Sequence, residues 1–357
     1  MTARQTPIKV LIVDDSALMR QMLTEFLSSD PEIEVVGAAP HPLIARSMIK
    51  ELTPDVLTLD IEMPQMDGLS FLERLMALRP MPVVMVSSLT QAGADAALQA
   101  LELGAVDFIG KPKVDLRSGM VELRAELIEK VKAAAGSRPR TGYRLKQDAG
   151  SGRGWGGSFS SSEKIIAIGA STGGVEALRE LLCVLPPAGP AVLVVQHMPA
   201  LFTASFAARL NGLAAATIQE ARDQVRVLPG HVYIAPGNFH LELKRSGANY
   251  LCAVSEGPLV SGHRPSVDML FHSVARSAGA NAVGVILTGM GRDGADGMLA
   301  MRRAGALTIG EDVSTCVVYG MPKAARDVGA TQIELPLGRI LPEVLSHCRM
   351  TGQTQRV

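Results

Sequence analysis

The sequence predicts an α/β protein with two doubly wound, mostly parallel sheets. Three observations lead to this fold class. The chain has 357 residues, more than one ordinary domain holds. Short apolar runs alternate with amphipathic helical patterns in both halves. Between the halves, residues 136–162 are rich in Gly, Ser and Arg, a composition that favours a flexible linker. We therefore expect one domain at 1–135 and a second at 163–357.

The first half shows five repeats of a strand followed by a helix. Strands are expected at residues 8–13, 34–39, 55–59, 82–87 and 106–109. Helices are expected at residues 17–28, 43–51, 69–78, 94–103 and 116–135. Five such units form a parallel sheet with helices on its faces. Ligands of such sheets bind at the carboxyl ends of the strands, so the site residues are sought there.

The alternation resumes after the linker. Strands are expected at residues 165–169, 191–196, 232–235, 251–254, 283–288 and 307–309. Helices are expected at residues 174–185, 203–210, 267–277, 295–304 and 323–328. This pattern predicts a second α/β domain whose sheet is again mostly parallel.

The charge balance and the cysteines argue against several classes of protein. The chain has 35 basic and 35 acidic residues, so no basic excess indicates nucleic-acid binding. No apolar stretch is long enough for a membrane span, and the N-terminal residues lack the pattern of a signal peptide. The four cysteines have no paired spacing, which is typical of reduced thiols rather than of disulfides or a zinc site. We expect a cytoplasmic protein without membrane insertion.

Five polar residues stand where strands of the first half are expected to end, namely Asp14, Asp15, Asp60, Ser87 and Lys111. The carboxyl ends of parallel strands meet at one edge of a sheet, so these side chains are expected to converge. A single Asp at such a position is commonly just a helix cap. Three crowded carboxylates need a cation between them, and oxygen ligands suit Mg²⁺. Asp60 is the best candidate for forming an acyl phosphate.

This arrangement resembles the receiver domain of two-component response regulators, over residues 10–112. The resemblance implies a flavodoxin-like fold in which Asp60 takes a phosphoryl group from a histidine kinase. It implies that Asp14, Asp15 and Asp60 bind Mg²⁺. It also implies that Ser87 and Lys111 sense the phosphate and drive a conformational change.

A candidate nucleophile, Ser171, stands in the segment GASTG at residues 169–173, which fits the G-x-S-x-G pattern of a nucleophile elbow. In such an elbow a strand ends, the chain reverses, and a helix begins, with glycines where the backbone is crowded. A dinucleotide-binding loop is the rival interpretation. That motif expects an acidic residue about 20 positions further on, but Gln196 and His197 stand at the end of the next strand.

A base and an orienting acid are expected at neighbouring strand ends. His197 directly follows the strand at 191–196. Consecutive strands of a βαβ unit usually lie side by side, so His197 is expected beside Ser171. The third member should hold the imidazole tautomer. Asp293, in the glycine-rich turn after the strand at 283–288, is preferred, with Asp296 and Asp268 as alternatives that could simply cap helices.

The same glycine-rich turn offers a backbone donor, because the amide of Met290 could donate to a developing oxyanion. The motifs GASTGG, VVQHMP, VLPGHVYIAPG, HRPSVD and LTGMGRDGADGM resemble those of the chemotaxis response-regulator protein-glutamate methylesterase family, CheB. The resemblance extends over nearly the whole chain apart from the linker. It implies that Ser171, His197 and Asp293 form a catalytic triad. Thr172 and the amide of Met290 would assist them.

The resemblance implies a phosphorylation-regulated serine hydrolase that serves sensory adaptation. It would demethylate glutamyl γ-methyl esters, and deamidate specific glutamines, on methylated chemoreceptors. Mg²⁺ would be needed for phosphorylation of the receiver and no cofactor for ester hydrolysis. The unphosphorylated receiver would block the active site, so residues 160–357 alone would be active without a phosphodonor. The alternative is a response regulator whose output domain only binds a partner, and Ser171→Ala discriminates the two.

Overall fold

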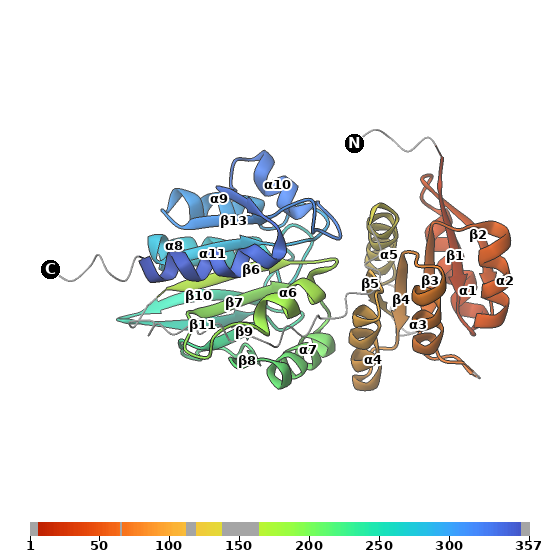
Figure 1. Cartoon of the computed structure of the whole chain (residues 1–357), viewed down its shortest axis with the longest axis horizontal. Helices are drawn as coiled ribbons and strands as arrows, with labels where there is room; N and C mark the ends of the chain where they lie inside the picture. Colours follow the sequence, from red (N-terminus) through yellow and green to blue (C-terminus); the bar gives the residue numbers. More distant parts are fainter. Residues whose placement is uncertain (1–5, 65, 112–118, 138–163, 351–357) are drawn as a thin grey trace. The chain divides into compact units, whose positions relative to one another are not determined.

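The computed structural model describes residues 6–64, 66–111, 119–137 and 164–350 (Figure 1). The described residues form two compact units, one before and one after the segment 138–163. Most of the predicted linker at 136–162 lies outside the described residues, and its first residue, Gly136, still belongs to a helix. The predicted domain bounds therefore stay a prediction.

The first unit is a five-stranded parallel sheet of order β2-β1-β3-β4-β5, with helices on both faces (Figure 1). Its strands are β1 (Ile8–Val13), β2 (Ile33–Ala39), β3 (Val56–Asp60), β4 (Val83–Ser87) and β5 (Asp107–Gly110). Its helices are α1 (Ala17–Ser28), α2 (Pro42–Leu52), α3 (Gly68–Leu78), α4 (Gln91–Glu102) and α5 (Gly119–Gly136). Every element predicted for this half is present, with ends shifted by a few residues. The first residues of the helix predicted at 116–135 lie outside the described residues.

The central strands of this sheet explain the apolar runs of the sequence. Every residue of β3 and β4 is buried, because helices cover both faces of the sheet. The last residue of each strand is nevertheless polar, Asp60 in β3 and Ser87 in β4. These buried polar ends lie at the carboxyl edge of the sheet, where the sequence predicts the phosphorylation site.

The second unit is built on a seven-stranded parallel sheet of order β14-β13-β12-β6-β7-β9-β8. Its strands are β6 (Ile165–Ala170), β7 (Ala191–Gln196), β8 (Thr217–Glu220), β9 (His231–Ile234), β12 (Ala282–Ile286), β13 (Leu307–Glu311) and β14 (Ile333–Leu335). Its helices are α6 (Gly174–Leu182), α7 (Ala200–Leu213), α8 (Val267–Ser277), α9 (Ala295–Arg303), α10 (Met321–Asp327) and α11 (Leu337–Met350), with a short 3-10 turn, η1 (Gly279–Asn281). The predicted architecture of two parallel sheets is confirmed.

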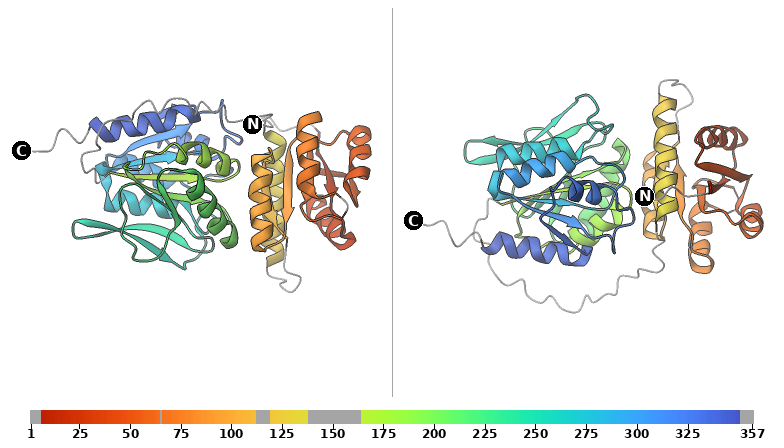
Figure 2. Two further views of the ribbon diagram at one scale, coloured as in Figure 1. Left: turned by 60° about the horizontal axis from the view of Figure 1, so that its bottom comes forward. Right: turned by 90° about the horizontal axis from the view of Figure 1, so that it is seen from above.

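Strand β6 lies at the centre of this sheet, between β12 and β7 (Figure 2). Its side chains alternate between two apolar layers. Ile165 and Ala167 belong to the core that includes Phe271 of α8 and residues of α9 and α10. Ile166 and Ile168 point to the opposite layer, which α6 and α11 close. Because both faces are covered, the carboxyl ends of β12, β6 and β7 form a fixed row at one edge.

The strand predicted at 251–254 is present, but it lies outside the parallel sheet. It forms β11 (Asn249–Ser255), which pairs antiparallel with β10 (His240–Ser246) in a separate two-stranded sheet. Ser246 pairs with Asn249, so only two residues connect the strands, and Gly247 has a φ of +58°. A connection this short permits a hairpin but not the crossover that a parallel neighbour requires.

Apart from the 3-10 turn η1, four elements have no counterpart in the sequence prediction: β8, β10, β14 and α11. Strand β14 has only three residues, all half-buried, and therefore shows no apolar run. Helix α11 contains Pro342, but its buried apolar residues keep helical spacing, at Leu337, Ile340, Leu341, Val344 and Leu345. Strand β10 alternates apolar and charged residues, and its last three residues are exposed. The three strands thus lack a strong local pattern, whereas α11 has an amphipathic pattern that the sequence prediction did not use.

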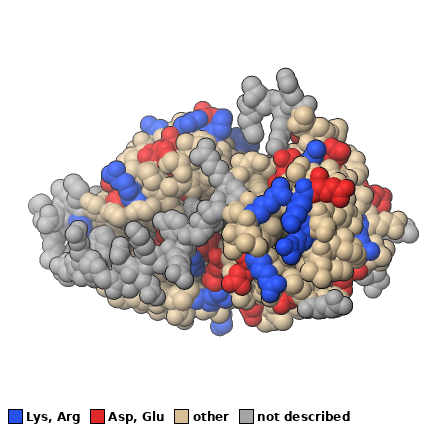
Figure 3. Space-filling model, turned by 45° about the vertical axis from the view of Figure 1, so that its right-hand side comes forward, with Lys and Arg blue, Asp and Glu red and all other residues tan. Residues whose placement is uncertain are grey.

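The surface carries charges of both signs. On the face shown in Figure 3, a cluster of Lys and Arg side chains is flanked by Asp and Glu. Within the parts of the chain that the structure describes, no helix combines the length and the apolar composition needed to cross a bilayer.

Candidate active site

Three adjacent strands of the second unit supply the candidate catalytic residues. Ser171 follows β6 directly, and His197 follows β7 directly. Asp293 lies in the loop that connects β12 to α9. Because β12, β6 and β7 are neighbours, the structure brings these three residues to one edge of the sheet.

The turn at Ser171 has the geometry of a nucleophile elbow. The strand ends at Ala170 and α6 begins at Gly174, with Gly173 at a φ of +78°. A Cβ at Gly174 would lie 2.2 Å from Oε1 of Gln196 and 2.7 Å from Cβ of Ala170. Glycine is therefore required at position 173 by the backbone conformation and at position 174 by the close approach of two strand ends.

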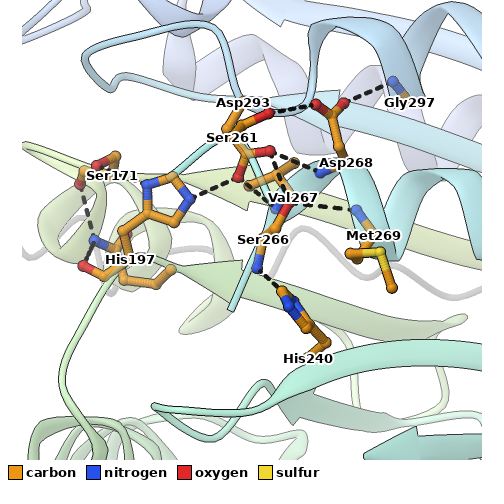
Figure 4. A network of polar contacts seen from close by, with 11 residues as sticks. Ser171, His197, His240, Ser261, Ser266, Val267, Asp268, Met269, Asp293 and Gly297 are labelled. Carbon is orange, nitrogen blue, oxygen red and sulfur yellow. Dashed lines mark hydrogen bonds and ion pairs between the residues drawn. The ribbon is translucent and has the colours of Figure 1, made fainter. Parts of the chain in front are cut away.

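The imidazole of His197 joins the other two residues (Figure 4). Its Nδ1 lies 3.2 Å from Oγ of Ser171, and its Nε2 lies 2.9 Å from Oδ2 of Asp293. An ionised carboxylate only accepts hydrogen bonds, so Nε2 carries the proton and the lone pair of Nδ1 faces the Ser171 hydroxyl. The side chains of His197 and Asp293 are 9% and 1% exposed, which keeps this line of contacts nearly free of water.

The N-terminus of α8 holds the carboxylate of Asp293. Its Oδ1 accepts from Ser266 Oγ at 2.8 Å and from the Asp268 N–H at 3.1 Å, and its Oδ2 accepts from the Val267 N–H at 2.7 Å. Burial by itself raises the pKa of Asp293, but His197 and these donors outweigh it and lower the pKa below its usual range. The positive end of the helix dipole acts in the same direction. Asp293 is thus ionised at neutral pH.

The two alternative acids have other partners. Asp268 accepts the Gly297 N–H at 2.7 Å and a hydrogen bond from Ser261 Oγ at 3.3 Å, and burial raises its pKa. Asp296 is largely exposed and pairs with Arg292 at 3.1 Å. The structure therefore brings Asp293, and neither alternative, to His197.

Sequence reasoning missed a second histidine at this site. The ring of His263 stacks on that of His197, with centroids 3.8 Å apart and planes inclined by 10°. His263 lies in the loop between β11 and α8 and is the first residue of the motif HRPSVD, but that motif gives no sign of a contact with His197. Only the path of that loop across the end of β7 places the two rings face to face.

The loop after β12 runs against the nucleophile. A Cβ at Gly289 would lie 2.8 Å from Cβ of Ser171, and Gly291 has a φ of +84°. The N–H of Met290, between these glycines, donates to no acceptor among the described residues. Thr172 is buried. A backbone donor without a partner beside a nucleophile is the arrangement that an oxyanion requires.

The predicted phosphorylation site forms a second cluster, in the first unit. Asp14, Asp15 and Asp60 each place one carboxylate oxygen within 4.8 Å of the others. Nζ of Lys111 lies 2.8 Å from Oδ2 of Asp60 and 3.2 Å from Oδ2 of Asp14. The hydroxyl of Ser87 donates to the Gly93 carbonyl at 2.8 Å, in the first turn of α4.

The electrostatics of this cluster fit a divalent cation. Burial, together with the nearby charge of Asp14, raises the pKa of Asp60 to about 6 in spite of Lys111. Burial also raises the pKa of Asp14. A divalent cation among these oxygens would relieve that crowding of negative charge, and an all-oxygen donor set suits Mg²⁺.

Comparisons with known proteins cover both units. Residues 166–344 match the family model of the CheB methylesterase, and residues 10–119 match that of the response regulator receiver domain. Proteins named protein-glutamate methylesterase/protein-glutamine glutaminase from Chromohalobacter salexigens and Salmonella typhimurium are each 55% identical over 350 residues, 98% of this chain and 99% of theirs. The crystal structure of the Thermotoga maritima CheB methylesterase catalytic domain is 39% identical with a TM-score of 0.51, and the match covers 52% of this chain and 98% of that one.

Proposed function

The chain belongs to the CheB methylesterase family, and we propose on this premise that it hydrolyses glutamyl γ-methyl esters through Ser171, His197 and Asp293. Its relatives are named for two activities, protein-glutamate methylesterase and protein-glutamine glutaminase, and this chain has both. The observation that carries the residue roles is the bridge that His197 forms between a hydroxyl at 3.2 Å and a buried carboxylate at 2.9 Å.

Ester hydrolysis proceeds in two halves. The Ser171 hydroxyl gives its proton to Nδ1 of His197 while its oxygen attacks the ester carbonyl. The Met290 N–H stabilises the oxyanion that forms, and Asp293 stabilises the imidazolium through its Nε2–H. The bond to the methoxy group then breaks, and His197 returns the proton so that methanol leaves. Water, activated by the same imidazole, hydrolyses the acyl-enzyme to glutamate and free Ser171.

Deamidation of glutamine follows the same steps with ammonia as the leaving group. The amine must be protonated as the C–N bond breaks, and the imidazolium of His197 is the group placed to do so. Both reactions turn a neutral side chain into a carboxylate. The substrates we propose are methylated chemoreceptors, whose signalling equilibrium would shift with each added negative charge.

The receiver domain supplies the regulation in this proposal. Asp60 accepts a phosphoryl group from a histidine kinase, and Asp14, Asp15 and Asp60 are the residues that would hold Mg²⁺. The ion, when bound, neutralises charge on the incoming phosphoryl group. Lys111 is already paired with Asp60 and would bind a phosphate oxygen, while Ser87 would leave the Gly93 carbonyl to do the same. Phosphorylation favours the active arrangement, and a free-energy shift of about 1.4 kcal/mol changes the ratio of the two forms tenfold.

Methanol release from a methylated receptor tests the proposal. The wild-type chain should release methanol, and release should increase with a phosphodonor and Mg²⁺. Ser171→Ala should abolish it. Ser277→Ala removes a hydroxyl that donates only to the Leu243 carbonyl at 2.8 Å, and it should leave the rate unchanged. Methanol release that survives Ser171→Ala would contradict the role of Ser171, and a wild-type chain that releases no methanol would favour the alternative, an output domain that only binds a partner.

A further inference from the structure

Thr288 connects the nucleophile elbow to the loop that carries Met290. It lies two residues beyond the end of β12 and is fully buried. Its carbonyl accepts the Ser171 N–H at 3.0 Å. Its hydroxyl donates to the Thr172 carbonyl at 3.0 Å. One residue thus holds the peptide group before Ser171 and the peptide group after Thr172.

The same hydroxyl also holds the segment on the other side of the loop. It accepts the Val318 N–H at 2.9 Å, so both its proton and a lone pair are used. Val318 in turn accepts the Gly289 N–H at 3.1 Å, and the Gly289 carbonyl accepts the N–H groups of Gly320 and Met321 at 3.1 and 2.8 Å. Gly289, the residue before Met290, is therefore held by hydrogen bonds through both its N–H and its carbonyl.

A buried carboxylate anchors Thr288 to the sheet. The Thr288 N–H donates to Oε2 of Glu311 at 2.8 Å, and Glu311 is the last residue of β13 and fully buried. Thr288 therefore has a fixed position from which its carbonyl and hydroxyl align the elbow and the loop.

We propose that Thr288 is a positioning residue that sets the place of the Met290 N–H relative to Oγ of Ser171. This inference rests on the proposed function. An oxyanion donor acts only when it lies about 2.7–3.1 Å from the developing charge. Without the hydroxyl, the buried Thr172 carbonyl and Val318 N–H lose a partner, and the backbone relaxes to find new ones. A displacement near 1 Å at a reacting group costs about 100-fold in rate.

The effect should appear in kcat rather than in KM, because the oxyanion exists only in the transition state. In the full-length chain, Thr288→Val removes the hydroxyl at nearly constant shape, and we expect kcat to fall by about 30-fold or more with KM within about threefold. Thr288→Ser restores a hydroxyl and should recover most of the rate. The pH dependence of kcat should keep its shape, because Thr288 does not contact His197 or Asp293.

Thr308→Val provides a matched control for stability. Thr308 is also fully buried, and its hydroxyl donates to the Ala330 carbonyl at 2.7 Å, away from the elbow. This variant should lose thermal stability and keep its kcat. A second readout is the rate at which a fluorophosphonate probe labels Ser171, which should fall with kcat in Thr288→Val.

Three outcomes would overturn the inference: Thr288→Val keeps kcat within about threefold of wild type, Thr288→Ser falls as far as Thr288→Val, or Thr308→Val loses kcat to the same extent. A different result would refute the proposed function, namely methanol release by the Ser171→Ala variant. An inactive Ser171→Ala together with a fully active Thr288→Val would leave the hydrolase proposal intact and refute only the role of Thr288.

Discussion

Replacing Asp293 by asparagine tests the central contact of the site. The carboxylate accepts four hydrogen bonds, from His197 Nε2 and the Val267 N–H on one oxygen and from Ser266 Oγ and the Asp268 N–H on the other. An asparagine side chain of the same shape has one oxygen and one NH₂ group. Whichever way the amide turns, the NH₂ group faces at least one donor and the negative charge is lost.

The two orientations of the amide harm catalysis differently. If the NH₂ group faces His197, Nε2 must accept, the proton moves to Nδ1, and Nδ1 no longer takes the proton of Ser171. If it faces Ser266, that hydroxyl reverses to accept, but the Asp268 N–H loses its partner. An Asp→Asn change in a Ser-His-Asp triad costs about 10⁴ in kcat, equivalent to about 5.4 kcal/mol. We expect a fall of about 10³ to 10⁴ here, with about 1–3 kcal/mol of stability lost through the unpaired N–H.

The assay is methanol release at saturating substrate, compared with Asp296→Asn. Asp296 lies three residues further along the chain, in the first turn of α9, is largely exposed and pairs with Arg292 at the surface. Its substitution should leave kcat unchanged, because exposed pairs contribute little. A kcat for Asp293→Asn within about tenfold of wild type would refute the assignment of the third triad member.

Three other outcomes are expected. Asp60→Asn, or chelation of Mg²⁺, should abolish the increase of methanol release by a phosphodonor and leave the basal rate in place; an increase that persists would contradict the phosphorylation site. Phe271→Ala, in the core under β6, should lower the free energy of unfolding in urea by about 3–5 kcal/mol. Because the pKa of Asp293 is lowered from 3.8 in the folded state, the stability that its charge supplies is complete above pH 3.8 and is lost as the pH falls through the folded-state pKa. The difference in unfolding free energy between wild type and Asp293→Asn should therefore narrow below pH 3.8, and a constant difference would contradict the shift.

Local sequence patterns predicted the positions where strands end, and with them much of the site. The apolar runs before Ser171 and His197 mark β6 and β7, and consecutive parallel strands are usually neighbours. The rule that ligands bind at carboxyl ends then places both residues at one edge before any coordinates are known. The same rule predicts that Asp14, Asp60 and Lys111 lie close together, and in the structure Lys111 pairs with both carboxylates.

Other features depend on contacts between distant segments. The sequence offered three acids as partners of His197, and only the N-terminus of α8, with its donors at 266–268, selects Asp293 and commits Asp268 to Gly297. The stacked ring of His263 and the contacts of Thr288 likewise come from loops far apart in the chain.

The sequence by itself determined most of the buried strands and helices, which residues stand at the strand ends of the site, and that the chain has two parallel sheets. The tertiary structure alone decided that β11 pairs with β10, which acid reaches His197 and which residues hold the elbow. The physical reason is that a segment with one or both faces buried carries apolar residues at the spacing of its own helix or strand. The choice of a hydrogen-bond partner depends on where another segment lies in space, and no local pattern records that.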